Sequence, residues 1–476
     1  MKKNIENKTK IIVTIGPATS SYEMLCALFE AGADVARLNF SHGSYDDHRK
    51  VIENINLYNH TYRTNVAILL DLQGPKLRVG EMENNSVDLK KGATLIVTTH
   101  PCVSTTEKLY VNYARLPIEA NAGETILLDD GKIELKILSS NGDDELTVEV
   151  VHGGILSSKK GFNLPQTKTT LPSLTEKDIA DLDFGLDNGV EWIGLSFVRK
   201  AADILELKKR IAAKEKNVKV IAKIEKPEAV DNIDEIIKVT DGVMVARGDL
   251  GVEMKMQEVP VIQKSIVLKC INAGKPVIVA TQMMETMIQN AVPTRAEVND
   301  IANAVFDGAD ALMLSAETSV GAYPIEAVKM MSNIIAEVEK QDVVYFKGQK
   351  PKPGSPTFMS DEICFTACGM SDHLKAKAII GMTYSGYTGY KISSFRPKAM
   401  IFIFTSNISL LNTFSMVWGV RGFYYNKYES TDDTFTDLVG ILKQHNLVES
   451  GDIVLHTASM PISEKSRTNT IKVSVV

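Results

Sequence analysis

Short apolar runs rich in β-branched residues alternate with longer amphipathic stretches as far as about residue 320. Most of these runs are almost continuously apolar, as strands are when βα crossovers bury both of their faces. Eight runs have this character: Ile11–Ile15, Ala33–Leu38, Val66–Leu70, Glu191–Phe197, Val218–Ile224, Gly242–Ala246, Pro276–Thr281 and Asp310–Ser315. Eight parallel strands with intervening helices predict a closed (β/α)8 TIM barrel in an α/β protein.

Two stretches between these runs carry helix start signals. Ser173 with Glu176, and Thr294 with Glu297, have the spacing of a capping box, in which the hydroxyl accepts an amide hydrogen bond and the carboxylate reaches back. We expect the first box to open the helix that precedes the fourth strand.

The third and fourth predicted strands are too far apart in the chain for one connecting helix, since one ends near Asp71 and the next begins near Glu191. The runs between them are short, β-rich and separated by Asn-Gly, Gly-Lys and Gly-Gly turns: Ala93–Thr98, Thr125–Leu128 and Glu145–Val151. This pattern predicts an inserted all-β domain. Placed above the third strand, such a domain can act as a lid that closes on a ligand and excludes water.

After about residue 340 the helical pattern ends at Lys350–Thr357, a segment of Pro, Gly and Lys that is typical of a linker. Five further runs alternate with helical stretches and predict a smaller open α/β sheet. They are Ala376–Thr383, Ala399–Thr405, Gly422–Tyr425, Asp452–Thr457 and Thr470–Val475. We therefore predict a catalytic barrel at 1–74 and 171–345, an inserted β lid domain at 75–170 and a C-terminal α/β effector and oligomerisation domain at 355–476.

Length and charge agree with several domains and small-molecule partners. The 476 residues exceed what one hydrophobic core usually serves. A net charge of −6 without a block of Lys or Arg gives no electrostatic footprint for nucleic acid. Met1 to Lys10 is polar, and no run approaches a membrane span, so we expect a soluble cytoplasmic protein with neither nucleic acid nor a membrane as partner.

The five cysteines are scattered, which favours reduced thiols over a disulfide framework. Cys364 and Cys368 are four residues apart, with His373 beyond them. A metal site is one interpretation. We favour two small buried thiols, because zinc usually takes four ligands.

The active site of a (β/α)8 barrel lies at the carboxyl ends of the strands, so polar residues directly after the apolar runs are candidates for chemistry. Lys223 is the last but one residue of the fifth run and Glu225 directly follows it, so the two flank one apolar residue and both side chains point to the barrel interior. Glu225 and Asp249, which follows the sixth run, have the carboxylate oxygens that Mg²⁺ or Mn²⁺ prefers. We predict a metal-dependent phosphoryl-transfer site, the alternative being a structural ion-pair network.

Three arginines near the same strand ends, Arg37, Arg78 and Arg247, are permanently charged donors suited to phosphate. Any one of them could instead be a solvated charge at the rim, and Gly248 could present its backbone in place of Arg247.

Asn39, Ser41 and Asp71 carry small oxygen-bearing groups at adjacent strand ends. These groups suit a monovalent cation, or serve to hold Arg37 in place. His42 lies at a strand-to-loop turn, where it is either a functional histidine or a hydrogen-bonded loop residue.

Several of these motifs, in their order along the chain, resemble the signatures of the pyruvate kinase family. The resemblance covers nearly the whole chain, and the family architecture of a barrel, an inserted β lid and a C-terminal α/β effector domain agrees with the domains predicted above. The motifs are Ala36-Arg-Leu-Asn-Phe-Ser-His-Gly43, Ala222-Lys-Ile-Glu225, Ala246-Arg-Gly-Asp-Leu-Gly251, Ala280-Thr-Gln-Met283 and Pro293-Thr-Arg-Ala-Glu297.

The resemblance implies transfer of the phosphoryl group of phosphoenolpyruvate to ADP, which gives ATP and an enolate that is protonated to pyruvate. It implies that Glu225 and Asp249 hold Mg²⁺ or Mn²⁺ while Lys223 stabilises the developing negative charge. The remaining roles implied are Thr281 as proton relay, Ser315 and Glu317 as an onward proton path, Arg37, Gly248 and Asp249 as substrate contacts, and His42, Arg78 and Lys177 as nucleotide contacts.

One departure concerns potassium. Many family members require K⁺, and they carry Thr, Lys and Glu where this chain has Leu72, Gln73 and Lys76. The corresponding monovalent-cation region of this chain would comprise Asn39, Ser41, Asp71 and Leu72. The ammonium of Lys76 can supply the positive charge that K⁺ provides and would repel that ion. We therefore predict activity without K⁺.

In the last domain, Thr383, Ser385, Gly386 and Thr388 open a helix and resemble the family's effector phosphate loop, although a simple helix cap has the same pattern. The facing segment, Thr457–Ser466, lacks the glycines usual there. We predict allosteric control by a sugar phosphate or a nucleotide and, from family habit, a homotetramer.

Two other functions fit parts of the pattern. A barrel lyase or mutase acting on phosphoenolpyruvate without ADP would have no use for the lid and Lys177. A catalytically inactive scaffold with this fold would be expected to lose Lys223, Glu225, Asp249 or Thr281, and all four are present.

Overall fold

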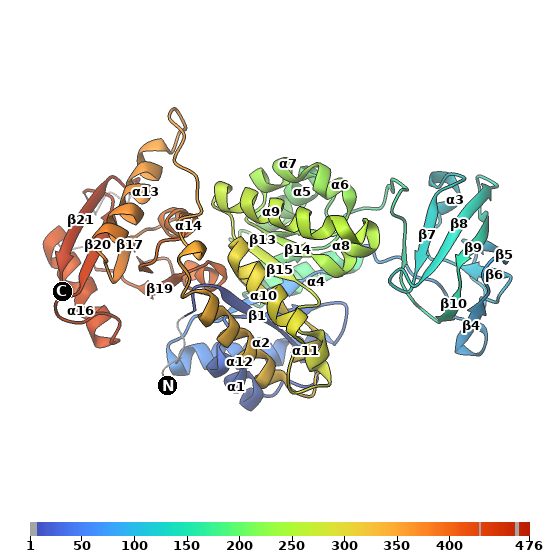
Figure 1. Cartoon of the computed structure of the whole chain (residues 1–476), viewed down its shortest axis with the longest axis horizontal. Helices are drawn as coiled ribbons and strands as arrows, with labels where there is room; N and C mark the ends of the chain where they lie inside the picture. The colour runs from blue at the N-terminus through green and yellow to red at the C-terminus, as the bar shows by residue number, and fades with distance from the viewer. Residues whose placement is uncertain (1–6, 428–429, 462–465) are drawn as a thin grey trace.

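Eight parallel strands close into a barrel in the middle of the molecule, between a β-rich domain on one side and an α/β domain on the other (Figure 1). This computed structural model describes residues 7–427, 430–461 and 466–476. All eight predicted runs form barrel strands, in the spatial order β1-β16-β15-β14-β13-β12-β3-β2. The strands are β1 (Lys10–Ile15), β2 (Val35–Asn39), β3 (Ala67–Asp71), β12 (Trp192–Leu195), β13 (Lys219–Ile224), β14 (Gly242–Ala246), β15 (Val277–Ala280) and β16 (Ala311–Leu314).

Amphipathic helices cover the outside of the barrel, and their apolar faces share one core with the outward-facing strand residues. They are α1 (Tyr22–Ala31), α2 (Tyr45–Tyr62), α4 (Glu176–Asp187), α5 (Ala201–Ala213), α6 (Pro227–Asp231), α7 (Ile233–Val239), α8 (Arg247–Glu253), η2 (Met256–Glu258), α9 (Val259–Ala273), η3 (Glu285–Ile288), α10 (Arg295–Asp307), α11 (Ala316–Ser319), α12 (Pro324–Val338) and η4 (Asp342–Val344). Within the described residues, no helix has both the length and the apolar character needed to span a bilayer.

One of the two predicted capping boxes is wrong by two residues. Helix α10 begins after Thr294, whose hydroxyl accepts from the amide of Glu297 as predicted. Helix α4 is instead capped by Thr175 with Asp178, while Ser173 is buried. The chain offers two overlapping Ser/Thr-x-x-acid patterns at this point, and burial of Ser173 in the tertiary structure selects the second.

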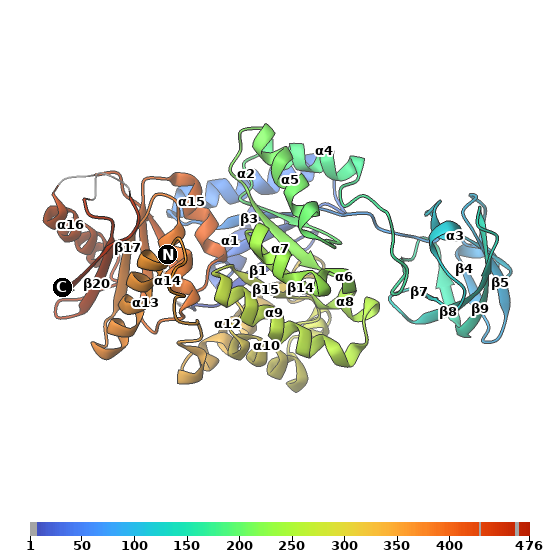
Figure 2. The same cartoon turned by 90° about the horizontal axis from the view of Figure 1, so that it is seen from above.

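The inserted β-rich domain has its own hydrophobic core and projects away from the barrel on two extended segments (Figures 1 and 2). Its strands form a six-stranded sheet in the order β11-β7-β8-β9-β5-β6 and a two-stranded sheet of β10 and β4. Its elements are η1 (Glu83–Asn85), β4 (Ser86–Leu89), β5 (Thr94–Thr98), β6 (Lys108–Tyr110), α3 (Leu116–Glu119), β7 (Thr125–Leu128), β8 (Ile133–Ser140), β9 (Glu145–His152), β10 (Gly154–Ser157) and β11 (Phe162–Asn163).

The C-terminal domain is an open five-stranded sheet in the order β19-β18-β17-β20-β21, with β21 antiparallel at one edge. It packs under the barrel, where Met416 joins the residues that fill the barrel interior. Its elements are α13 (Phe358–His373), β17 (Ala378–Met382), α14 (Tyr387–Ser394), β18 (Met400–Thr405), α15 (Ile408–Thr413), η5 (Phe414–Met416), β19 (Val420–Tyr424), α16 (Thr431–Gln444), β20 (Ile453–Ala458) and β21 (Thr470–Val475).

Cys364 and Cys368 are both buried in α13, within the apolar core of this domain. Burial raises the pKa of the Cys364 thiol to about 12. In the described part of the chain, no group of three or more His, Cys, Asp or Glu side chains is placed to hold a metal ion. Both side chains pack among apolar residues of this core, as buried cysteines commonly do.

Candidate active site

Lys223 is the centre of a buried charge cluster at the carboxyl ends of the barrel strands. Its Nζ lies 3.1 Å from Asp71 Oδ1 and 3.0 Å from Glu225 Oε1. It also donates to Ser196 Oγ at 2.6 Å. Burial disfavours the ammonium charge, but the carboxylates of Asp71 and Glu225 outweigh burial and hold the pKa of Lys223 above its usual value. Lys223 is therefore a fixed positive charge.

Asp71 connects Lys223 to Arg37 on the neighbouring strand. The guanidinium donates from Nε to Asp71 Oδ2 at 2.7 Å, and its Nη1 donates to Thr14 Oγ1 at 2.9 Å. Burial of Asp71 is more than offset by the charges of Lys223 and Arg37, which lower the pKa of the carboxyl. Of the two roles predicted for Asp71, the structure contains the one in which it holds Arg37 in place.

Glu225 and Asp249 lie close enough for their charges to interact. Glu225 Oε2 accepts from the amide of Phe197 at 2.6 Å. Burial raises the pKa of Glu225, and the negative charge of Asp249 acts in the same direction against the opposing effect of Lys223. Two carboxylates that repel each other beside a cleft suit a divalent cation, which would neutralise both. The donor set, carboxylate oxygens on neighbouring strand ends, fits Mg²⁺ or Mn²⁺.

Thr281 follows β15 in a left-handed conformation, with φ of 70°. Its hydroxyl accepts from the amide of Gly248 at 2.7 Å and donates to the carbonyl of Ala280 at 2.6 Å. The guanidinium of Arg247 donates to the carbonyl of Thr281 at 2.7 Å and pairs with Asp300 at 2.8 Å. Such a backbone conformation costs about 1–3 kcal/mol unless its surroundings hold it. Arg247 is thus a partner of the Thr281 loop rather than a solvated charge at the rim.

Ser315 and Glu317 follow the eighth strand as predicted, but they are bonded to each other and to a loop. Glu317 is buried, and its carboxylate accepts from the amides of Ser315 at 2.7 Å and Met284 at 3.2 Å. Among the described residues, no hydrogen bond joins either of them to Thr281.

The three predicted nucleotide contacts lie on different elements. Lys177, in the first turn of α4, donates to the carbonyl of Phe40 and to Asp181 Oδ2, both at 2.6 Å. His42 is exposed in the loop after β2. Arg78 lies in the inserted domain, where its Nη1 donates to the carbonyl of Lys159 at 2.8 Å. The first two therefore belong to the barrel, whereas the position of Arg78 depends on the inserted domain.

The predicted monovalent-cation region surrounds the ends of β2 and β3. Asn39 accepts from the amide of Ser41 at 3.2 Å, and the carbonyl of Leu72 accepts from Ser196 Oγ at 2.7 Å. Lys76 is exposed on the segment that leads into the inserted domain.

A cleft between the barrel and the inserted domain contains part of this site. It is lined from the barrel by Asp249, Glu253, Lys226, Phe197 and Arg199, and from the inserted domain and its connections by Pro75, Lys76, Leu77, Asp130, Gly161, Phe162, Asn163, Thr169 and Leu171. The proposed metal carboxylate Asp249 and the proposed K⁺ substitute Lys76 thus face the same space.

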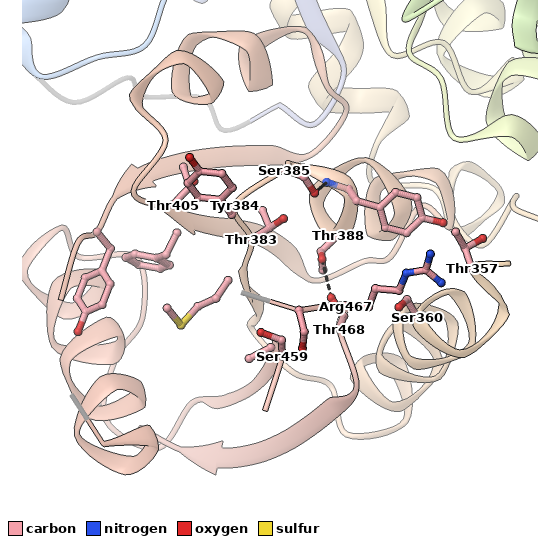
Figure 3. A pocket seen from close by; sticks show the side chains of 16 residues that line it. Thr357, Ser360, Thr383, Tyr384, Ser385, Thr388, Thr405, Ser459, Arg467 and Thr468 are labelled. Carbon is pink, nitrogen blue, oxygen red and sulfur yellow. Dashed lines mark hydrogen bonds between the residues drawn. The ribbon is translucent and has the colours of Figure 1, made fainter. Parts of the chain in front are cut away.

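A second cavity, of about 450 Å³, lies in the C-terminal domain (Figure 3). The predicted effector loop forms one wall of it with Thr383, Ser385 and Thr388, and the amide of Gly386 donates to Thr383 Oγ1 at 3.1 Å. Thr388 and Thr468 share a 2.7 Å hydrogen bond across the cavity floor. Of the facing segment, residues 462–465 lie outside the described part of the chain.

The sequence-based interpretation missed Ser196 and Phe197, which bond Lys223 and Glu225. A usable signal was present, because both residues directly follow Leu195 at the end of β12, in the position that identified the other candidates. It also missed Asp181, which is fully buried and shared between Lys177 and the hydroxyl of Tyr45.

Known proteins agree with this geometry. Residues 6–328 match the family described as pyruvate kinase, barrel domain, and residues 361–474 match pyruvate kinase, alpha/beta domain. The chain is 44% identical to a pyruvate kinase of Geobacillus stearothermophilus, over 99% of this chain and 81% of that protein. It is 42% identical to one of Staphylococcus saprophyticus, over 98% of this chain and 80% of that protein.

A crystal structure of a pyruvate kinase from Cryptosporidium parvum superposes with a TM-score of 0.92 at 34% identity, over 99% of this chain and 96% of that one. The sequence matches and this superposition span both the barrel and the C-terminal domain. The chain belongs to the pyruvate kinase family.

Proposed function

We propose that the chain transfers the phosphoryl group of phosphoenolpyruvate to ADP, giving pyruvate and ATP, with a divalent ion held by Glu225 and Asp249. The observation that carries this proposal is the position of Lys223. Its ammonium is held between two carboxylates at the carboxyl end of the barrel, and the neighbouring Asp249 lines a cleft. Family membership supports the same reaction.

Lys223 would stabilise the negative charge that develops on the transferring phosphoryl group and on the enol oxygen. A permanently charged group that is already oriented needs no reorganisation during the reaction, which is the basis of electrostatic catalysis. Mg²⁺ or Mn²⁺, when bound, would neutralise substrate oxygens and orient them for transfer. Arg37, fixed by Asp71 and Thr14, would contact the phosphoryl group.

The enolate that remains would take a proton relayed by Thr281. Its hydroxyl accepts from the amide of Gly248, and this hydrogen bond holds the two residues together. Ser315 and Glu317 would carry the proton onward, and His42, Arg78 and Lys177 would contact the nucleotide. A proton passing from Glu317 to Thr281 would need a bridging water, because no hydrogen bond joins the two side chains among the described residues.

The direct test is a coupled assay for pyruvate formation from phosphoenolpyruvate, ADP and Mg²⁺. The purified protein should form pyruvate only when all three are supplied, and Lys223→Met should abolish most of the activity. Pyruvate released without ADP would point to a lyase and sink the proposal.

We further propose that the reaction does not need K⁺, because Lys76 supplies a positive charge near the cleft. Activity should be nearly full in a tetramethylammonium buffer. A many-fold increase on addition of KCl would contradict this.

The cavity in the C-terminal domain supports allosteric control by a sugar phosphate or a nucleotide. Its hydroxyl-rich wall and the nearby Arg467 suit phosphate oxygens. Titration with candidate effectors should shift the phosphoenolpyruvate concentration at half-saturation, and Thr383→Ala should remove that shift.

A homotetramer is supported by apolar surface on the described elements. Val261 and Leu268 of α9 are 70% and 52% exposed, and the edge strand β21 exposes Val473 and Val475. Light scattering of the purified protein would be expected to give four times the chain mass of 52.3 kDa.

A further inference from the structure

The inserted domain contacts the barrel through helix α8, away from its two connecting segments. Asn163 of β11 donates from Nδ2 to Glu253 Oε1 at 2.7 Å. Gly131, in the turn between β7 and β8, faces Val252 of the same helix. Lys226 of the barrel donates to the same oxygen of Glu253 at 2.6 Å. One carboxylate oxygen is therefore shared between the two domains.

The buried carboxylate of Glu253 is stabilised by its hydrogen bonds from Asn163 and Lys226. Its side chain is fully buried, and within the described residues its other oxygen, Oε2, has no hydrogen-bond partner. A buried carboxylate with one unpaired oxygen is costly, and removal of either remaining partner increases that cost. The position of Glu253 should therefore respond to whether Asn163 is in contact.

The barrel residues of this contact are covalently close to the two proposed metal ligands. Helix α8 spans Arg247–Glu253, so Asp249 lies one turn before Glu253 on a single short helix. Lys226 directly follows Glu225. Asp249, Glu253, Lys226 and Asn163 all line the same cleft. A displacement of Glu253 along α8 would displace Asp249 as well.

We propose that Asn163 and Glu253 are positioning residues for the divalent-ion site. Their contact transmits the position of the inserted domain to Asp249 through α8 and to Glu225 through Lys226. Neither residue touches the ion or the substrate. This inference rests on the assignment of Glu225 and Asp249 as metal ligands under the proposed function.

The test is Mn²⁺ binding to the full-length protein without substrates, followed by the electron paramagnetic resonance signal of free Mn²⁺. Asn163→Ala and Glu253→Gln are each expected to weaken binding about tenfold, as substitutions behind metal ligands commonly do. The double variant should bind about as weakly as the weaker-binding single variant, because both substitutions weaken the same contact between Asn163 and Glu253. In the pyruvate assay, the half-saturating Mn²⁺ concentration should rise by the same factor.

Glu258→Gln is the matched control, because Glu258 is a carboxylate in η2, just beyond α8, that is about half exposed and, among the described residues, pairs only with the exposed Lys255, at 3.8 Å. It should bind Mn²⁺ like the unmodified protein. Asn163 is only half-buried, so Asn163→Ala decides the question even if Glu253→Gln does not fold.

Different variants test the positioning role of Asn163 and the assignment of Glu225 and Asp249 as metal ligands. Unchanged Mn²⁺ binding in Asn163→Ala, or additive effects in the double variant, would overturn the positioning role. If Glu225→Gln and Asp249→Asn bind Mn²⁺ as tightly as the unmodified protein, the metal assignment fails instead.

Discussion

The two ends of the barrel both bury charged side chains, but the surroundings of the two clusters differ. At the carboxyl end, Lys223 lies between Asp71 and Glu225, and Asp249 beside this cluster lines a cleft. At the base, Arg396 pairs with Asp310 at 2.8 Å, and both side chains are almost completely buried where the C-terminal domain meets the barrel. Both clusters pair a basic side chain with carboxylates, but within the described residues only the cluster at the carboxyl end lies next to a residue that lines a cleft, Asp249.

At the base, groups of the protein itself surround both charges, although Arg396 Nε has no hydrogen-bond partner among the described residues. Asp310 accepts from the amides of Val277 at 3.0 Å and Trp418 at 3.2 Å in addition to Arg396. Arg396 also stacks on the Trp418 ring at 4.9 Å and donates to the carbonyl of Gly308 at 2.9 Å. A buried ion pair therefore indicates function only when some of its bonding capacity faces a cleft.

The largest effect should come from removing the charge at the open end. Lys223→Met is expected to lower kcat by at least about 1000-fold, because it removes the positive charge that stabilises the transferring group. The free energy of unfolding should fall less than for a substitution at the base, since Asp71 retains Arg37. The pyruvate assay and urea unfolding measure the two quantities. If Lys223→Met remains active, the cluster at the carboxyl end does not have the catalytic role proposed for it.

At the base the expected effect is on stability. Arg396→Met leaves Asp310 buried without its ion-pair partner and should lower the free energy of unfolding by about 3–5 kcal/mol. Urea unfolding followed by the fluorescence of the adjacent Trp418 measures this. The kcat of the folded protein at 25 °C should stay within about twofold of the unmodified value.

Lys398→Met is the control for Arg396→Met. Lys398 pairs with Asp342 at 2.9 Å, but both side chains are largely exposed, so its removal should change stability much less. If both variants lose the same free energy of unfolding, burial of the Arg396–Asp310 pair does not increase its contribution to stability.

Ser196→Ala sharpens the comparison by loosening Lys223 without removing its charge. The hydroxyl accepts from Lys223 and donates to the carbonyl of Leu72, so its loss frees the ammonium to move. We expect kcat to fall about tenfold, the equivalent of roughly 1.4 kcal/mol in the barrier. Ser196→Thr, which keeps a hydroxyl, should recover part of the activity. Full activity in Ser196→Ala would show that Asp71 and Glu225 alone orient Lys223.

The smallest effect concerns a second carboxylate at the base. Glu191 accepts from Asn412 of the C-terminal domain and from the amide of Ile68, both at 2.7 Å, and burial raises its pKa to about 7. Because this pKa lies above the unfolded value of 4.5, its stabilising contribution is complete below pH 4.5 and is lost as the pH rises through 7. The free energy of unfolding should fall by on the order of 1 kcal/mol between pH 6 and 8.

Urea unfolding of Glu191→Gln at both pH values checks this assignment. The amide of glutamine does not lose a proton in this range, so the fall in the free energy of unfolding between pH 6 and 8 should shrink by the same amount. An unchanged pH dependence in this variant would assign the effect to other groups.

Much of the site was predictable because the barrel imposes a simple rule. Lys223 lies at the end of an apolar run, Glu225 and Asp249 follow such runs, and residues in these positions meet at one end of a parallel barrel. The rule also covers Ser196 and Phe197, which directly follow the fourth strand of the barrel.

Other features were not predictable from local pattern. The choice between Ser173 and Thr175 as the α4 cap depended on which hydroxyl the fold buries. The pairing of Asn163 with Glu253 joins residues 90 positions apart, and the pairing of Arg396 with Asp310 joins residues 86 apart. Contacts between domains have no sequence periodicity, because nothing in either segment specifies how the domains are placed.

The sequence by itself determined the eight barrel strands, the inserted β domain, the C-terminal sheet and the residues at the strand ends. These follow from hydrophobic period and from strand direction, which are local properties. Only the tertiary structure decided that Lys223 is paired with both Asp71 and Glu225, and that Arg247 supports Thr281. It also decided that the charged cluster at the base is closed off, while Asp249 beside the one at the carboxyl end lines a cleft. The physical reason is that the energy of a buried charge depends on every group around it, and those groups come from distant parts of the chain.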